Sequence, residues 1–173
     1  ALTAWFNPTI NSYKRINAPV TASGATWSPN TITYSGNNRT HMIRVPGPGR
    51  FELRLMDGAT NPYLLQAGII ATGLDGIEKK RNPGKPVHLN MYEESHKVKG
   101  AKKLPTSLEH SLKHLGNNKI IKSAFGKKVI DSYIKLKTRE IKNYQSSMIK
   151  TLGFRDAKKL NNKNIITQWE KDN

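Results

Sequence analysis

The sequence predicts an α+β fold in which short antiparallel strands come first and packed helices follow. Residues 31–34, 39–45 and 50–56 are short runs rich in β-branched, aromatic and other apolar residues, separated by turn residues. From residue 62 onward, apolar residues recur at helical spacing in several segments. A chain of 173 residues with 36% hydrophobic content is long enough to bury one core.

Four extended segments are expected in the first sixty residues. Residues 12–16 form a short run that stops before Pro19, and residues 31–34 end at a Ser-Gly-Asn-Asn turn. Residues 39–45 and 50–56 flank a Gly-Pro-Gly turn, as in a hairpin. In the second of these runs Phe51, Leu53 and Leu55 alternate with charged residues, so we expect one apolar face.

The helices are predicted from caps and periodicity. Residues 62–80 are expected to be helical, because Asn61 can cap and Pro62 suits the first position. A polar loop over 82–104 follows, and Thr106 with Glu109 suggests the next helix start. A short helix should end at Gly126, and the longest should cover about 129–148. Its expected buried residues are Val129, Ile130, Tyr133, Ile134, Leu136 and Ile141.

A cluster of charged residues on the hairpin is the candidate site. Arg50, Glu52 and Arg54 share one face of their strand, because alternate residues of a strand point the same way. The neighbouring run brings Arg39 and Arg44 beside that face. Either this is an exposed strand face with mutual ion pairs, or it binds an external anion such as a phosphate or a substrate carboxylate. Glu52 could then hold a divalent cation.

The net charge of +17 is distributed unevenly. Residues 1–75 carry +3, with five arginines and one lysine, whereas residues 76–173 carry +14, mostly from lysine. Such lysines indicate a solvated helix surface, and a basic nucleic-acid-binding module remains a distant alternative. The positions expected on the exposed side of the longest helix are Lys128, Lys135, Arg139 and Lys142.

Several functional classes find no support in the sequence. There is no cysteine, which excludes a disulfide framework and thiolate chemistry. No apolar run is long enough to span a membrane and no secretory signal is recognisable, so a cytoplasmic protein without a membrane partner is expected. His110 and His114 lie four residues apart on a predicted helix, but no carboxylate partner is in reach, so the pair is weak evidence for a metal site.

Four ordered motifs resemble the glutamine synthetase family. They are "NPTINSYKRI" (7–16), "NNRTHMIRVP" (37–46), "GRFELRLMDGATNPYLLQAGIIATGLDGI" (49–77) and "NMYEE" (90–94). The stretch "APVTASGATWSPN" (18–30) is most similar to the branch labelled type III and to γ-glutamylmethylamide synthetases. The resemblance implies that residues 1–150 are the C-terminal portion of the catalytic domain and 151–173 a Lys/Asn-rich segment. The N-terminal domain and the first half of the catalytic domain would then lie upstream.

The resemblance also implies roles for the charged residues that bind substrate. The family's counterparts of Arg15 and Arg54 bind glutamate. The counterpart of Arg39 contacts both glutamate and an ATP phosphate and stabilises the transferring phosphoryl group, so Arg39 is the implied catalytic residue. The counterpart of Glu52 ligates Mg²⁺ or Mn²⁺.

ATP is the implied co-substrate, held by the counterparts of Arg39, Arg44 and Arg50. The implied reaction is ligation of glutamate with ammonia through γ-glutamyl phosphate, in a homo-oligomer that is a dodecamer by family resemblance. However, residues 15–19 lack the "GYEAP"-type segment whose glutamate deprotonates ammonium in the common bacterial form. The acceptor therefore stays open between ammonia and methylamine or another small amine. Tyr92 aligns with a tyrosine that is adenylylated in some relatives, and it is expected to be an ordinary exposed loop residue.

Overall fold

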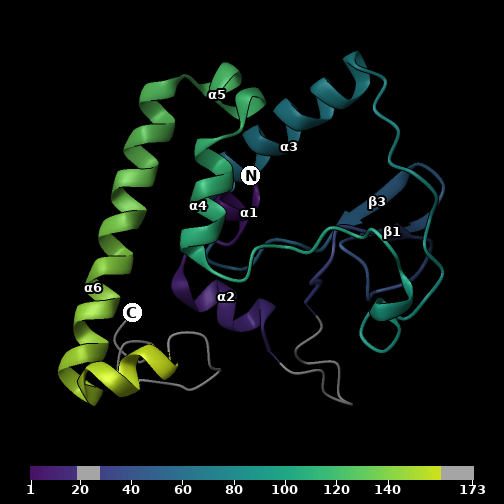
Figure 1. Cartoon of the computed structure of the whole chain (residues 1–173). Helices are drawn as coiled ribbons and strands as arrows, with labels where there is room; N and C mark the ends of the chain where they lie inside the picture. The colour runs from purple at the N-terminus through teal and green to yellow at the C-terminus, as the bar shows by residue number, and fades with distance from the viewer. Residues whose placement is uncertain (19–27, 161–173) are drawn as a thin grey trace.

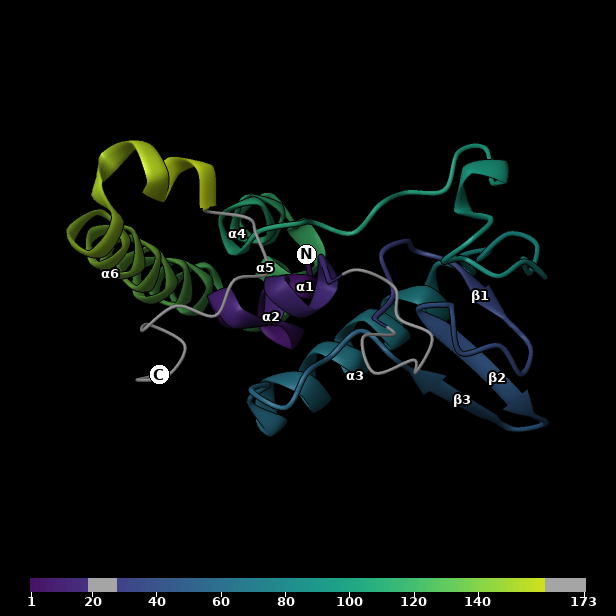
Figure 2. The same cartoon turned by 90° about the horizontal axis from the view of Figure 1, so that it is seen from below.

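The computed structural model describes residues 1–18 and 28–160, and places a group of helices beside a small three-stranded sheet (Figure 1). Helix α3 extends from the helical group toward the sheet (Figures 1 and 2). This is the expected α+β arrangement. The elements are α1 (Thr3–Phe6), α2 (Ile10–Ile16), β1 (Tyr34–Ser35), β2 (Ile43–Gly47), β3 (Arg50–Leu53), α3 (Pro62–Glu78), η1 (Ser95–Lys97), α4 (Leu108–Gly116), α5 (Lys119–Phe125) and α6 (Lys127–Leu160).

The prediction of an extended segment over residues 12–16 is wrong, because these residues belong to helix α2. Thr9 and Ser12 form a reciprocal cap, in which each side chain accepts a hydrogen bond from the other's backbone N–H. The buried residues Ser12, Tyr13 and Ile16 are spaced as on one side of a helix. Five residues were too few to reveal that period, and the N-cap residue Thr9 lies before them.

The hairpin of β2 and β3 is antiparallel as expected, but β1 pairs with β2 in parallel. The turn contains Gly49 at φ +70°, a conformation that favours glycine. Arg44 lies directly opposite Glu52, and a bulge separates this pair from the pair Gly47–Arg50. The expected apolar face is only partly buried, because Leu55 is buried whereas Phe51 is 61% exposed.

Trp5 lies at the centre of the helical core. Its side chain is 1% exposed, and its ring meets the rings of Phe125 and Tyr133 edge-on at centroid distances of 4.8 and 6.3 Å. The Tyr133 hydroxyl donates a hydrogen bond to the Ala4 carbonyl at 2.7 Å. These contacts tie α1 to α5 and α6, so the short first helix organises segments more than a hundred residues further along the chain.

The later helices begin close to their predicted positions, but the predicted end of the longest helix, at about residue 148, is wrong because α6 ends at Leu160. Asn61 caps α3, Ser107 rather than Thr106 caps α4, and α5 ends at Gly126. The buried face of α6 was partly mispredicted, because Val129 is 49% and Leu136 62% exposed whereas Ile130 is fully buried. The helix also continues to Leu160, into the segment set apart from residue 151 in the sequence. None of the described helices is long and apolar enough to cross a membrane.

The long connection between α3 and α4 is held beside the sheet by hydrogen bonds. The backbone N–H of Val87 donates to the Tyr34 carbonyl at 3.0 Å, and that of Met91 donates to the Thr40 hydroxyl at 2.9 Å. His41, which is fully buried, lies 3.0 Å from the Thr33 hydroxyl and 3.1 Å from the Leu89 carbonyl through its two ring nitrogens. These bonds bring the "NMYEE" segment beside the hairpin.

Candidate active site

Glu52 joins two arginines from both strands of the hairpin. One carboxylate oxygen accepts a hydrogen bond from Arg44 at 2.6 Å and the other accepts one from Arg54 at 3.0 Å. Arg44 is also hydrogen-bonded to the Asn37 side chain. The hydrogen bond from Arg44, together with the charges of Arg44 and Arg54, holds the pKa of Glu52 below its usual range, so the carboxylate is ionised at neutral pH.

Arg15 approaches the same cluster from helix α2. One of its terminal nitrogens donates to the Asn7 side chain at 2.9 Å and to the Leu55 carbonyl at 2.8 Å. Burial lowers the pKa of Arg15, and the nearby positive charge of Arg54 adds to that effect, while Asp57 opposes it. The Nε atom of Arg15 is buried and has no hydrogen-bond partner within the described part of the chain. A buried donor of this kind is costly unless another group satisfies it.

Asn7 and Tyr92 are members of the cluster that the sequence did not identify. Asn7 is fully buried, and its amide nitrogen donates to the Leu55 carbonyl at 3.0 Å while its oxygen accepts from Arg15. The Tyr92 hydroxyl oxygen is buried, which corrects the expectation of an exposed loop residue. Burial raises the pKa of Tyr92, and the charges of Arg54 and Arg15 oppose that rise. The tyrosine therefore lies near both arginines.

Arg39 and Arg50 lie outside this network. Both side chains are exposed, and within residues 1–18 and 28–150 neither makes a hydrogen bond or an ion pair to another side chain. The six charged residues predicted for the site thus fall into two sets. Arg15, Arg44, Glu52 and Arg54 are brought together, whereas Arg39 and Arg50 are free to contact a ligand.

The cluster has the chemistry of an anion site, and it contains one carboxylate of the kind that ligates a hard cation. Arginine donors in planar arrangement suit carboxylates and phosphates. The Glu52 side chain is 43% exposed, so its oxygens keep lone pairs accessible beyond those used by the arginines. A single carboxylate is one ligand of several that Mg²⁺ requires, and no set of three or more such ligands gathers among the described residues.

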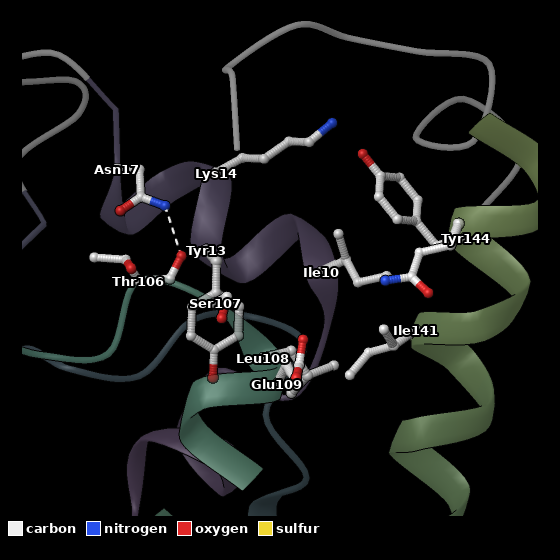
Figure 3. Close-up of a pocket in the computed structure, with 11 residues that line it drawn as sticks. Ile10, Tyr13, Lys14, Asn17, Thr106, Ser107, Leu108, Glu109, Ile141 and Tyr144 are labelled. Atoms are coloured by element: carbon white, nitrogen blue, oxygen red, sulfur yellow. Dashed lines mark hydrogen bonds between the residues drawn. The ribbon is translucent and has the colours of Figure 1, made fainter. Parts of the chain in front are cut away.

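A separate cavity of about 160 Å³ lies between α2, the start of α4 and α6 (Figure 3). Lys14 and Tyr144 flank it, with the ammonium nitrogen 5.9 Å from the ring centroid, and Asn17 donates to the Thr106 carbonyl at 2.8 Å. None of the predicted site residues lines this cavity. Helix α2 therefore directs Lys14 to the cavity and the adjacent Arg15 to the charged cluster.

The basic surface of α6 is expected to be solvated rather than to bind nucleic acid. Lys128, Lys135, Arg139 and Lys142 are exposed as predicted, and exposed ammonium groups stay hydrated at little cost. Titration with duplex and single-stranded oligonucleotides at physiological salt should show no saturable binding with a Kd below about 1 μM. A lower Kd would be tighter than ordinary non-specific binding. Tighter saturable binding would restore the nucleic-acid alternative.

Comparison with known proteins identifies the family. A family model described as "Glutamine synthetase, catalytic domain" matches residues 1–152. A protein named glutamine synthetase from Rhizobium leguminosarum bv. phaseoli is 52% identical over 172 residues, covering 99% of this chain and 35% of the relative. One named glutamate–methylamine ligase from Methyloversatilis universalis is 45% identical over 147 residues, with 83% and 33% covered. The chain thus spans about a third of the length of these relatives.

Solved structures agree with the sequence relatives. A structure described as "GmaS/ADP complex-Conformation 1" superposes with a TM-score of 0.78 at 47% identity, covering 99% of this chain and 35% of that one. A Plasmodium falciparum glutamine synthetase structure gives a TM-score of 0.65 at 26% identity, covering 89% and 39%. Sequence motifs, family model and fold therefore agree, and the chain belongs to the glutamine synthetase family.

Proposed function

We propose that this chain forms the C-terminal part of the catalytic domain of an ATP-dependent carbon–nitrogen ligase that joins glutamate to ammonia or a small amine. The observation that carries the proposal is the bridge from Arg44 through Glu52 to Arg54, with Arg15 beside it. These are four of the residues for which the family resemblance implies a role in binding substrate, nucleotide or metal. Arg15 on α2 adds a buried Nε donor without a partner among the described residues, which ion pairing on the strand face does not account for.

In this proposal, two arginines of the cluster bind glutamate. Arg15 and Arg54 would hold the substrate carboxylates, and the Nε atom of Arg15 would find in a carboxylate the acceptor that it lacks within the described residues. Asn7 fixes the direction of the Arg15 guanidinium through the bond of 2.9 Å. Tyr92, with its buried hydroxyl, would close the cluster against water.

The phosphoryl step relies on positive charge and positioning. Arg39, Arg44 and Arg50 would bind the ATP phosphates, with Arg39 also reaching the glutamate γ-carboxylate. An oxygen of that carboxylate attacks the γ-phosphorus, ADP leaves, and γ-glutamyl phosphate is formed. The amine nitrogen then attacks the acyl carbon, phosphate leaves, and an amide results after loss of a proton. Such transfer requires little from the protein beyond orientation and charge neutralisation.

Glu52 is the residue that would hold a divalent metal ion. It is ionised and partly exposed, which fits one position in the oxygen shell of Mg²⁺ or Mn²⁺. A bound cation supplies charge neutralisation for the phosphate oxygens. Arg44 and Arg54 hold the carboxylate in one orientation, so the ligand is positioned before the cation arrives. The remaining ligands would come from upstream parts of the longer, oligomeric and cytoplasmic enzyme.

The acceptor amine is tested by a direct comparison of substrates. Relatives named glutamine synthetase and glutamate–methylamine ligase are both similar to this chain, which keeps γ-glutamylmethylamide synthesis as the second candidate. Full-length enzyme should be assayed for ADP release with glutamate and ammonium, methylamine or ethanolamine. We expect the highest kcat/KM with ammonium, whereas a higher value with methylamine would select the second candidate. No amine-dependent ADP release with any of the three would contradict the ligase proposal.

Arg50 allows a separate test of nucleotide binding. Because its side chain is exposed and makes no bond within the described residues, Arg50→Ala should leave the fold intact. Loss of one charge-assisted phosphate contact should raise the KM for ATP about tenfold in full-length enzyme, with a smaller effect on the KM for glutamate. Arg139→Ala, at an exposed arginine of α6, is the matched control and should change neither constant. Equal KM values for ATP in the two variants would contradict the assignment.

A further inference from the structure

Two histidines of α4 lie with their ring nitrogens facing each other. His110 and His114 are four residues apart on this nine-residue helix, and their Nε2 atoms are 3.1 Å apart, a hydrogen bond between the two rings that a cation bound to both nitrogens would replace. The ring centroids are separated by 4.8 Å and the ring planes are inclined by 37°. Both side chains are exposed. Positions four apart share one face of a helix, so the backbone itself brings the two imidazoles together.

The separation of the two nitrogens is the one that a chelated cation requires. With metal–nitrogen bonds of about 2.0–2.1 Å, two nitrogens 3.1 Å apart subtend an angle of about 95–102° at the metal. That angle lies between the roughly 90° of octahedral or square-planar sites and the roughly 109° of tetrahedral ones. A cation can therefore bind both rings without a change in the helix.

The helix holds this pair in place from its other side. Leu108, Leu112 and Leu115 are buried in the core, and the Ser107 side chain accepts a hydrogen bond from the His110 backbone N–H at 3.2 Å. The neighbouring carboxylate, Glu109, is paired with Lys113 at 3.0 Å. The backbone of the pair is thus fixed before any ligand binds, while the exposed rings leave the remaining coordination positions open to water.

We infer that His110 and His114 form a bidentate site for a divalent transition-metal ion of the class Ni²⁺, Cu²⁺ or Zn²⁺. Imidazole nitrogen suits these cations, whereas Mg²⁺ prefers oxygen ligands. To bind through both Nε2 atoms, each ring carries its remaining hydrogen on Nδ1. The inference is independent of the proposed ligase reaction, because neither histidine belongs to the charged cluster around Glu52.

The test is a calorimetric titration of full-length protein with Ni²⁺ in the presence of saturating Mg²⁺, which occupies oxygen-rich sites. The parent should bind one Ni²⁺ per chain at a site whose affinity falls at least about tenfold in His110→Ala and in His114→Ala, since each variant loses the chelate. His96→Ala removes another exposed histidine and is the matched control, with unchanged affinity expected. A loss of less than tenfold in either α4 variant, or absence of that site in the parent, would overturn the inference.

A second measurement counts the ligands directly. Electron paramagnetic resonance of one equivalent of Cu²⁺ on the parent should show coupling to two imidazole nitrogens, and each α4 variant should show fewer. Circular dichroism of the variants should match the parent, because both side chains are exposed and alanine favours a helix. Coupling to a single nitrogen in the parent would exclude chelation by the pair.

Discussion

Replacement of Glu52 with glutamine is expected to lower the kcat of the full-length enzyme by about 100-fold or more, the scale of a lost electrostatic contact at a reacting centre. The amide keeps the size of the side chain and can still accept a hydrogen bond from one arginine. It removes, however, the negative charge that lies between Arg44 and Arg54 and that a hard cation requires. Steady-state rates at saturating ATP, glutamate and Mg²⁺ measure the effect.

Glu109→Gln is the matched control for this experiment. Glu109 is an exposed carboxylate on α4 that pairs with Lys113, so the same chemical change there should leave kcat within about twofold of the parent, as exposed ion pairs contribute little. If Glu52→Gln stays within about threefold of the parent, a barrier change under about 1 kcal/mol, the proposed ligand role of Glu52 is wrong.

Trp5→Ala is expected to have the largest effect on stability, about 3–5 kcal/mol in the free energy of unfolding. The substitution removes the ring that α1 places against Phe125 and Tyr133, and leaves a cavity where three helices meet. This is a large part of the 5–15 kcal/mol that stabilises a typical domain. Urea unfolding of the full-length enzyme, followed by circular dichroism at 222 nm, measures the change.

Two further variants show whether burial is the cause. Trp5→Phe keeps an aromatic ring in the core and should cost clearly less than the alanine variant. Tyr63→Ala changes a residue that is 82% exposed, and should alter the free energy of unfolding by less than about 0.5 kcal/mol. Equal losses in Trp5→Ala and Tyr63→Ala would mean that the core around Trp5 does not carry the stability of the chain.

Much of the fold could be predicted because its signals are local. The cap at Asn61, the break at Gly126 and the period of the later helices are each contained in a few neighbouring residues. The exposure of Val129 and Leu136 could not be predicted from the same pattern. Which part of an apolar stripe is covered depends on the neighbours that the tertiary structure provides, and within the described residues these do not cover Val129 or Leu136.

From the sequence pattern, the arrangement of the candidate site was predictable only within the hairpin. The alternation in residues 50–54 placed Glu52 beside Arg54, and the hairpin turn placed Arg44 opposite it. Asn7 and Tyr92 depend on contacts between distant segments, Asn7 with Leu55 and the "NMYEE" loop with Thr40. A sequence pattern of period two or three carries no information about such contacts, although the Asn-Pro pair at 7–8 could have suggested a fixed turn.

The bulge in the hairpin has a consequence for how this region can change in evolution. Two residues of β2, Val45 and Pro46, lie opposite one residue of β3 between the pairs Arg44–Glu52 and Gly47–Arg50. Because of this bulge, the strand pairing next to the turn, at Gly47–Arg50, is offset from the pairing at Arg44–Glu52. Insertions or deletions beyond the bulge can therefore reposition Arg50 without moving Glu52 out of line with Arg44. Related proteins could therefore differ in loop length, and so in the position of Arg50 and its proposed phosphate contact, while they keep the Arg44–Glu52 pair unchanged.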